Sequence, residues 1–228
     1  QSVFSFKIRG AYNKIAQLSP SEKKQGVIAA SAGNHAQGVA LAAAKLKISA
    51  TIVMPETTPD IKIEGVKRFG AKVILFGDDF STAFAKAQEL SVQKSLVFIP
   101  PFDDPLVIAG QGTIALELLR QYTKDIYAIF IPIGGGGLIS GIGAYIKTVR
   151  PEIKIIGVES DESASMYTSL QRGRRVKLKN VGIFADGVAV AQVGKEPFRL
   201  AKKVIDEIVL ADVDQICAAV KDLFEDTR

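Results

Sequence analysis

The sequence predicts an α/β protein in which two open, mostly parallel sheets carry helices on both faces. Short apolar runs rich in Val and Ile alternate with longer stretches of helical period along the chain. This alternation is typical of parallel sheets whose strands are joined by helices, because both faces of such a sheet are covered. The 228 residues suffice for one large domain or two smaller ones.

Seven apolar runs are predicted as strands: residues 26–30, 50–54, 72–76, 96–100, 128–133, 154–158 and 207–211. Seven periodic stretches are predicted as helices: residues 36–46, 60–69, 79–93, 105–121, 137–149, 197–205 and 213–224. Start and stop signals agree with two of these helices. Pro59 and Asp104 precede predicted starts, and Gly70 follows a predicted end.

The domain boundaries are inferred from topology, because no repeat or low-complexity linker marks them. Residues 29–105 are predicted to form a small inserted α/β subdomain that carries the loop after the first strand. Residues 1–28 and 106–228 are predicted to form the large domain, which shares the other sheet. The chain then resembles one domain inserted into another.

Composition excludes several classes of protein. A single Cys217 cannot form an internal disulfide, and a single His35 argues against a His-rich metal site, so no metal is expected. The net charge is +5, and basic and acidic residues are interspersed along most of the chain. The one basic cluster, residues 172–179, contains no aromatic side chain that could stack on bases. No apolar run approaches the roughly 20 residues of a membrane span. We therefore expect neither a nucleic-acid nor a membrane partner.

Residues 31–38 (SAGNHAQG) directly follow a predicted strand, at the edge where open α/β sheets bind ligands. Their small side chains would leave the N-terminus of the next helix open to a carboxylate or phosphate. An N-cap by Ser31 or Asn34 with nothing bound is an equally good interpretation. For His35 and Cys217 we expect structural roles, the cysteine as a small hydrophobe.

Four consecutive glycines, residues 134–137, separate a predicted strand from a predicted helix. Ordering each glycine costs roughly 1 kcal/mol relative to alanine in regular structure, so the run must be offset by something that needs it. A ligand that approaches the backbone closely and accepts from several N–H groups, such as a phosphate, is the simplest explanation. A tight strand-to-helix turn is the structural alternative. The run matches neither a Walker loop nor G-x-G-x-x-G.

The loop of residues 5–13 places Lys7 between Phe6 and Ile8. An apolar environment would lower the pKa of the Lys7 amine and make it a nucleophile, although a surface lysine gives the same pattern. A reactive lysine, a carboxylate loop and a phosphate loop together are what an enzyme needs to use pyridoxal 5′-phosphate on an amino acid.

Five segments, residues 5–11, 31–38, 108–113, 134–138 and 184–189, resemble the fold type II pyridoxal-phosphate enzymes, which have the tryptophan synthase β-like fold. Within that family the chain is most similar to the biosynthetic threonine dehydratases, those of plants in particular. The resemblance implies dehydration and deamination of L-threonine, and possible use of L-serine, in the first step of isoleucine biosynthesis. It further implies a homo-oligomer, located in the plastid stroma for a plant enzyme and otherwise in the cytoplasm.

By this resemblance, Lys7 would bind the aldehyde of pyridoxal 5′-phosphate and then move the α-proton of the substrate. Phe6 would pack against the cofactor ring, and Asn34 would hydrogen-bond its 3′ oxygen. The cofactor phosphate would lie on Gly134, Gly135, Gly136, Gly137 and Leu138. The large domain would thus be the cofactor-binding domain.

The substrate would be bound by Ser31, Ala32, Gly33, Asn34 and His35. Serine racemases of the family carry a second Ser at the position of Ala32, which acts as a base on the opposite face. Ala32 therefore favours elimination over racemisation. The resemblance also implies that this chain is an internal part of a longer catalytic domain.

Other functions stay open at this point. Within the family, serine dehydratase, serine racemase and cysteine synthase are alternatives, although cysteine synthases typically carry a Thr-Ser-Gly-Asn-Thr loop. A nicotinamide dehydrogenase would use the glycine run as a pyrophosphate turn and Glu159 as the ribose acceptor. A non-catalytic sensing or scaffold module is the third class, and the presence of Lys7 argues against it.

Overall fold

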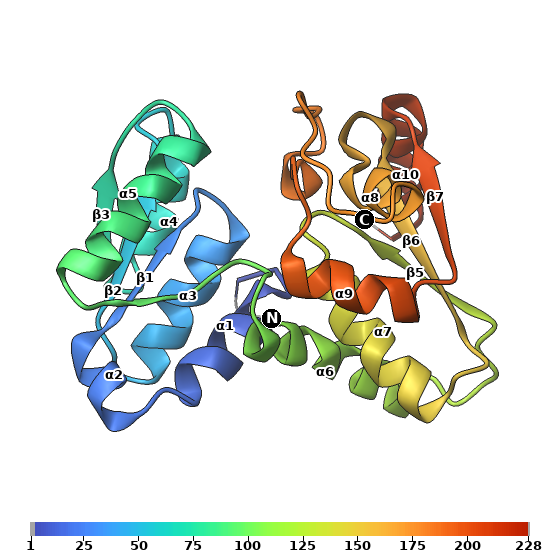
Figure 1. Ribbon diagram of the computed structural model, residues 1–228, viewed down its shortest axis with the longest axis horizontal. Helices are drawn as coiled ribbons and strands as arrows, with labels where there is room; N and C mark the ends of the chain where they lie inside the picture. Colours follow the sequence, from blue (N-terminus) through green and yellow to red (C-terminus); the bar gives the residue numbers. More distant parts are fainter. Residues whose placement is uncertain (1–2, 228) are drawn as a thin grey trace. The chain divides into compact units, whose positions relative to one another are not determined.

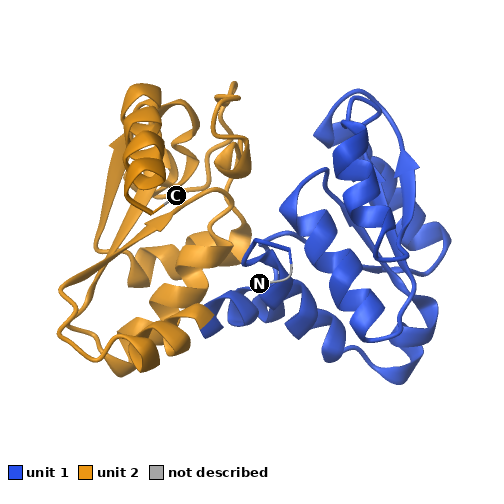
Figure 2. Ribbon diagram, turned by 180° about the vertical axis from the view of Figure 1, so that it is seen from behind, with its two compact units in different colours: residues 1–113 blue, residues 114–228 orange. Residues whose placement is uncertain are grey.

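The computed structural model describes residues 3–227, so Gln1, Ser2 and Arg228, at the ends of the predicted large domain, lie outside it. The chain divides into two compact units, residues 1–113 and residues 114–228 (Figure 2). Each unit contains one parallel sheet with its own helices. The predicted fold class is thereby confirmed.

The elements of the first unit (Figure 1) are α1 (Lys7–Ala16), α2 (Pro20–Gln25), β1 (Val27–Ala30), α3 (Asn34–Lys45), β2 (Ala50–Met54), α4 (Asp60–Lys67), β3 (Lys72–Leu75), α5 (Phe80–Gln93) and β4 (Val97–Phe98). Helix α6 (Pro105–Gln121) begins in the first unit and ends in the second. The second unit continues with β5 (Ala128–Pro132), α7 (Gly137–Val149), β6 (Lys154–Ser160), the 3-10 turn Asp161–Ser163, α8 (Ser165–Gln171), the 3-10 turn Asp186–Val188, α9 (Lys195–Val204), β7 (Glu207–Ala211) and α10 (Val213–Thr227).

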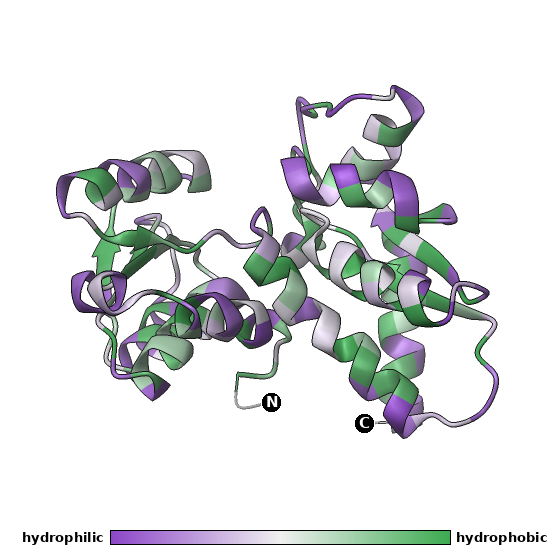
Figure 3. Ribbon diagram, turned by 60° about the horizontal axis from the view of Figure 1, so that its bottom comes forward, coloured by the Kyte–Doolittle hydropathy of each residue, from purple (hydrophilic) through white to green (hydrophobic). Residues whose placement is uncertain are grey.

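The first sheet has the strand order β3-β2-β1-β4, and all its pairs are parallel. Its strands are hydrophobic along most of their length (Figure 3). Because side chains alternate along a strand, Val27 and Ala29 of β1 join a core with α1, α3 and α4, whereas Ile28 and Ala30 join a second core with α5. Helices therefore cover both faces, as a doubly buried parallel sheet requires.

The second sheet has the order β5-β6-β7 and is also parallel. Its core is built mainly from isoleucines, among them Ile131 of β5, Ile155 of β6 and Ile146 of α7. Phe198 of α9 completes this core. The β-branched residues suit the strands, and the same residue type on α7 packs against them.

All seven predicted strands are present, and β4 is shorter than expected. The predicted boundaries of α6 and α7 agree with the structure at both ends, and Gly70 has the left-handed φ of +78° expected after a helix.

Three helices, α1, α2 and α8, were not predicted from the sequence. For α1 the prediction was wrong. The segment of residues 5–13 was expected to be a loop, but helix α1 begins at Lys7. The apolar spacing of Ile8, Ala11 and Ile15 fits a helix. Helix α2 carries a capping box, with the Ser19 side chain accepting from Glu22 N–H and the Glu22 carboxylate accepting from Ser19 N–H. The short α8 had no comparable signal.

The strands predicted at residues 26–30, 50–54, 72–76 and 96–100 form one sheet. Residues before β1 pack in the same compact unit as that sheet, through the contact of α1 with α3. The grouping of residues 1–28 with residues 106–228 in one domain stays a prediction.

Helix α1 crosses α6 at a pair of glycines, Gly10 and Gly110. A Cβ on Gly110 would lie 2.6 Å from the carbonyl oxygen of Arg9 and 2.6 Å from the Cα of Gly10. Both neighbours are backbone atoms, which cannot move aside as a flexible side chain would. The Gly10 N–H also donates to Oε1 of Gln111 at 3.3 Å. This close crossing fixes the helix that begins with Lys7.

We expect Gly110→Ala to destabilise the protein by about 1–3 kcal/mol through overpacking of this crossing. The matched control is Gly65→Ala in α4, where a Cβ would meet only the Gln37 side chain at 3.4 Å. This control should be neutral or stabilising by up to about 1 kcal/mol, because alanine is the better helix former. Urea denaturation followed by circular dichroism measures both. A stabilised Gly110→Ala variant would show that the crossing tolerates a methyl group.

Candidate active site

Lys7 is the first residue of α1, and its side chain is half-buried. The Nζ atom donates to the carbonyl oxygen of Pro101 at 3.1 Å and lies 5.3 Å from the centroid of the Phe6 ring. Burial lowers the pKa of the Lys7 amine from its ordinary value to about 8. A sizeable fraction of this amine is therefore neutral near physiological pH, as a nucleophile or base requires.

The backbone at Lys7 is held close to α3, which packs along α1 (Figure 1). A Cβ on Gly38 of α3 would lie 3.1 Å from the carbonyl carbon of Lys7 and 3.1 Å from the nitrogen of Ile8. Such distances are tighter than ordinary contacts. Gly38 therefore allows the approach of the two helices that sets the position of Lys7.

The loop after β1 leaves the N-terminus of α3 open. The Gly33 N–H donates to Oγ of Ser31 at 3.1 Å, and Gly33, as N-cap, supplies no side-chain cap. A Cβ on Gly33 would meet nothing within 4 Å, and Asn34, the first residue of α3, is exposed. Ala32 is half-buried. These uncapped N–H groups and the helix dipole suit a carboxylate.

His35 is buried and lies one residue inside α3. Its Nε2 lies 2.9 Å from the carbonyl oxygen of Ile99. Burial, and secondarily the nearby charge of Lys7, lower the pKa of His35 to about 3. The ring is therefore neutral, and because a carbonyl only accepts, Nε2–H is the donor. This geometry agrees with the structural role expected for His35.

The glycine run connects β5 to α7 in the second unit. Gly136, the N-cap of α7, has φ +90°, and a Cβ there would lie 2.8 Å from both Met166 Cε and Pro197 Cβ. A Cβ on Gly134 would lie 3.1 Å from the Cα of Val188. These two glycines are therefore required by conformation and packing.

The remaining part of the run presents backbone donors. Gly135 and Gly137 are buried, and the Gly135 carbonyl accepts from Gly194 N–H at 3.1 Å. Leu138, half-buried, is the second residue of α7, which has no side-chain cap and no acidic residue in its first turn. The first N–H groups of a helix have no partner within it, so this end suits a phosphate.

Lys7, Phe6 and the loop of residues 31–35 belong to the first unit, and residues 134–138 belong to the second. The structure brings Lys7 and His35 to one segment, residues 99–101, which accepts a hydrogen bond from each. Neither Ile99 nor Pro101 was predicted as part of the site. No sequence signal marks a backbone carbonyl as an acceptor.

Glu159 does not fit the role of a ribose acceptor. Its buried carboxylate accepts from the N–H groups of Met166 at 2.8 Å and Tyr167 at 2.7 Å, and so caps α8. Burial raises the pKa of Glu159 to about 7. This side chain is occupied within the fold, which removes the main support for the dehydrogenase interpretation.

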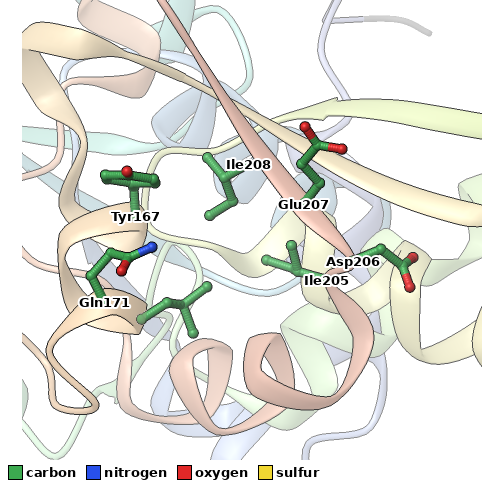
Figure 4. A pocket seen from close by; sticks show the side chains of 7 residues that line it. Tyr167, Gln171, Ile205, Asp206, Glu207 and Ile208 are labelled. Atoms are coloured by element: carbon green, nitrogen blue, oxygen red, sulfur yellow. The ribbon is translucent and has the colours of Figure 1, made fainter.

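A pocket of about 290 Å³ lies elsewhere in the second unit, between α8 and the start of β7 (Figure 4). It is lined by Tyr167, Leu170, Gln171, Ile205, Asp206, Glu207 and Ile208. None of the predicted site residues lines it. Asp206 is already engaged with Lys147 at 2.7 Å and with the Ile155 N–H at 2.7 Å.

Within residues 3–227, His, Cys, Asp and Glu side chains form no group of three or more suited to a metal ion. In the same part of the chain, no helix has the length and apolar composition that a membrane crossing needs.

Each unit has features that suit pyridoxal phosphate. The first unit holds a half-buried lysine amine of lowered pKa and the uncapped N-terminus of α3, and the second holds a glycine turn that leads into the uncapped N-terminus of α7. Comparison with curated proteins finds "Threonine dehydratase, mitochondrial" from Saccharomyces cerevisiae, 60% identical over 99% of this chain and 40% of that protein. "L-threonine dehydratase biosynthetic IlvA" from Burkholderia multivorans is 55% identical over 100% of this chain and 46% of its own length. The chain thus spans less than half of these relatives.

Among solved structures, the processed form of threonine deaminase isoform 2 from Solanum lycopersicum matches with a TM-score of 0.98 and 56% identity, over 100% of this chain and 66% of that one. Maize serine racemase matches with a TM-score of 0.94 and 34% identity, over 98% of this chain and 67% of that one. The family model described as "Pyridoxal-phosphate dependent enzyme" covers residues 1–228. This chain therefore belongs to the family of pyridoxal-phosphate dependent enzymes.

Proposed function

We propose that the enzyme containing this chain converts L-threonine to 2-oxobutanoate and ammonia. The observation that carries the proposal is the half-buried Lys7 amine, with its pKa near 8, in a chain 55–60% identical to threonine dehydratases. In the net reaction the Cβ–O bond breaks and water leaves, and water later replaces the amino nitrogen. No water is consumed overall.

Lys7 is the proposed attachment point of the cofactor and the base for the substrate. Pyridoxal phosphate, when bound, withdraws electrons from the α-carbon of an attached amino acid. The neutral amine of Lys7 would accept the α-proton, and burial makes a larger fraction of that amine neutral at physiological pH than in an ordinary lysine. Phe6, beside the amine, would pack on the cofactor ring, and Asn34 would bind the 3′ oxygen.

The loop of residues 31–35 is proposed to bind the substrate carboxylate. The Ser31 hydroxyl accepts from Gly33 N–H, so its own proton is available to a carboxylate oxygen. The uncapped N–H groups at the start of α3, including that of His35, would add further donors. Ala32 has no side-chain base, which favours elimination over racemisation.

The glycine run is proposed to bind the cofactor phosphate. Gly134 and Gly136 give the turn its shape, and the N–H groups from Gly135 to Leu138 would be the donors. Because α7 begins with no acidic residue, its dipole is left uncompensated for an anion.

L-serine dehydration or serine racemisation is the alternative, favoured by the similarity to maize serine racemase. A homo-oligomer is part of the proposal. The printed names of relatives include a mitochondrial yeast enzyme and a chloroplastic enzyme of Arabidopsis thaliana. For this protein the proposed location is the plastid stroma in a plant and the cytoplasm otherwise.

We expect the full-length enzyme, supplied with pyridoxal phosphate and L-threonine, to release 2-oxobutanoate and ammonia in equal amounts. With L-serine, pyruvate and ammonia should form without accumulation of D-serine, because Ala32 offers no base on the opposite face. Assays of 2-oxo acid, ammonia and amino-acid enantiomers measure these products. Substantial D-serine would favour the racemase, and the absence of any 2-oxo acid would contradict the proposal.

We expect pyridoxal phosphate to attach to Lys7, and the rate of attachment to rise with pH and level off near pH 8. Only the neutral amine reacts, and the pKa of Lys7 is about 8, whereas an ordinary lysine would gain reactivity up to about pH 10. Borohydride reduction at a series of pH values, followed by peptide mapping, measures the attachment.

The control for this experiment is Lys45→Ala, which removes an exposed lysine at the end of α3 and should leave labelling unchanged. Lys7→Ala should abolish the visible absorbance of the lysine-bound cofactor and all turnover. Recovery of the pyridoxyl label on another lysine would contradict the assignment of Lys7 as the cofactor lysine.

We expect Gly135→Val to reduce the preference of the enzyme for pyridoxal phosphate over pyridoxal by about tenfold or more. A branched side chain in the turn would block the phosphate, whereas pyridoxal lacks that group. Equilibrium titrations with both compounds give the ratio, and Gly65→Ala should keep the wild-type ratio. An unchanged ratio in folded Gly135→Val protein would place the phosphate elsewhere.

A further inference from the structure

The segment of residues 99–101, which leads from β4 toward α6, is held from two sides. The Ile99 N–H donates to the carbonyl oxygen of Ile28 at 2.9 Å and continues the sheet by one residue. The Ile99 carbonyl, in contrast, accepts from Nε2 of His35 at 2.9 Å. Two residues later the Pro101 carbonyl accepts from Nζ of Lys7 at 3.1 Å.

The segment has few other ways to be anchored. Pro100 and Pro101 have no backbone N–H, so their only backbone hydrogen bonds are those that their carbonyls accept. Their φ angles are fixed by the rings, which makes the two-residue connection stiff. The position of the Pro101 carbonyl therefore depends strongly on the direction that the chain takes at Ile99.

His35 is well suited to set that direction. It is buried in the first turn of α3, and Ile99 is fully buried. Because the His35 ring stays neutral, its donor does not change over the physiological pH range. A buried hydrogen bond of this kind is costly to leave unmade, since the buried Ile99 carbonyl would lose its partner away from solvent.

We propose that His35 is a positioning residue for Lys7: it anchors the Ile99 carbonyl, and the stiff proline pair then places the Pro101 carbonyl that orients the Lys7 amine. A neutral amine that donates one hydrogen to Pro101 keeps its lone pair directed away from that carbonyl. Orientation of this kind accelerates attack on an aldehyde. The inference rests on the proposed role of Lys7 as the cofactor lysine.

The test uses amide replacements that differ in reach. In His35→Gln the side-chain nitrogen stands close to the place of Nε2 and can donate to Ile99. In His35→Asn it stands close to the place of Nδ1 and falls short of that carbonyl. His35→Leu removes the donor altogether. Each variant of the full-length protein is mixed with pyridoxal phosphate, and the rate of attachment to Lys7 is followed by visible absorbance and confirmed by reduction and mapping.

We expect His35→Asn and His35→Leu to attach the cofactor about tenfold more slowly, and His35→Gln to recover to within about threefold of wild type. Thermal midpoints are measured in parallel. A merely structural role would lower the midpoint but leave the attachment rate of the folded protein unchanged, and that outcome overturns the inference. So does a His35→Gln rate as low as that of His35→Leu.

A second variant tests the connection without touching His35. Pro100→Gly keeps both carbonyls and frees the backbone between them, so it should also slow attachment in the folded protein, with a modestly lower thermal midpoint because glycine loosens the unfolded chain. A wild-type rate in this variant would show that the proline pair transmits nothing. If the wild-type protein itself attaches no cofactor at Lys7, the proposed function fails, which is distinct from a failure confined to the variants.

Discussion

The burial of one amine is the constraint on which the site in the first unit depends. An ammonium ion loses hydration when it is buried, and this loss lowers the pKa of Lys7 to about 8. The burial exists because α1 lies unusually close to its neighbours, at Gly38 on α3 and at Gly10 and Gly110 where it crosses α6. The chemistry of Lys7 thus depends on Gly10 in its own helix and on two glycines far from it in sequence, Gly38 and Gly110. A methyl group at any of these positions would press on backbone atoms or on closely packed side chains.

The glycine run in the second unit combines a tight turn with a backbone suited to bind a phosphate, and the sequence alone does not distinguish these two reasons for it. Gly136 needs its left-handed φ and the space beside Met166, and Gly134 needs the space beside Val188, with or without a ligand. Part of the entropic cost of the run is therefore explained by the turn itself. The N–H groups at the start of α7, which no side chain caps, are the part that still suits a phosphate.

Two buried titratable side chains show how the fold uses hydrogen bonds. His35 and Glu159 are both desolvated, so burial lowers the pKa of the base and raises the pKa of the acid. Each is satisfied by backbone partners, His35 by the Ile99 carbonyl and Glu159 by two N–H groups of α8. In both cases a buried polar side chain joins its own element to a neighbouring segment of the fold.

The sequence by itself determined the local elements: seven strands from their apolar runs, helices α6 and α7 to the residue, and the turn at Gly70, because these depend on period and on turn chemistry within a few residues. It also determined the family, through motifs that lie in short contiguous segments. Helix α1 was misjudged although its apolar spacing was present. Only the tertiary structure decided the strand order β3-β2-β1-β4, the pKa of Lys7 and the partners of Lys7 and His35. All of them depend on contacts between residues far apart in sequence, and the hydrogen bonds of Lys7 and His35 join residues 94 and 64 positions apart, which no local pattern records.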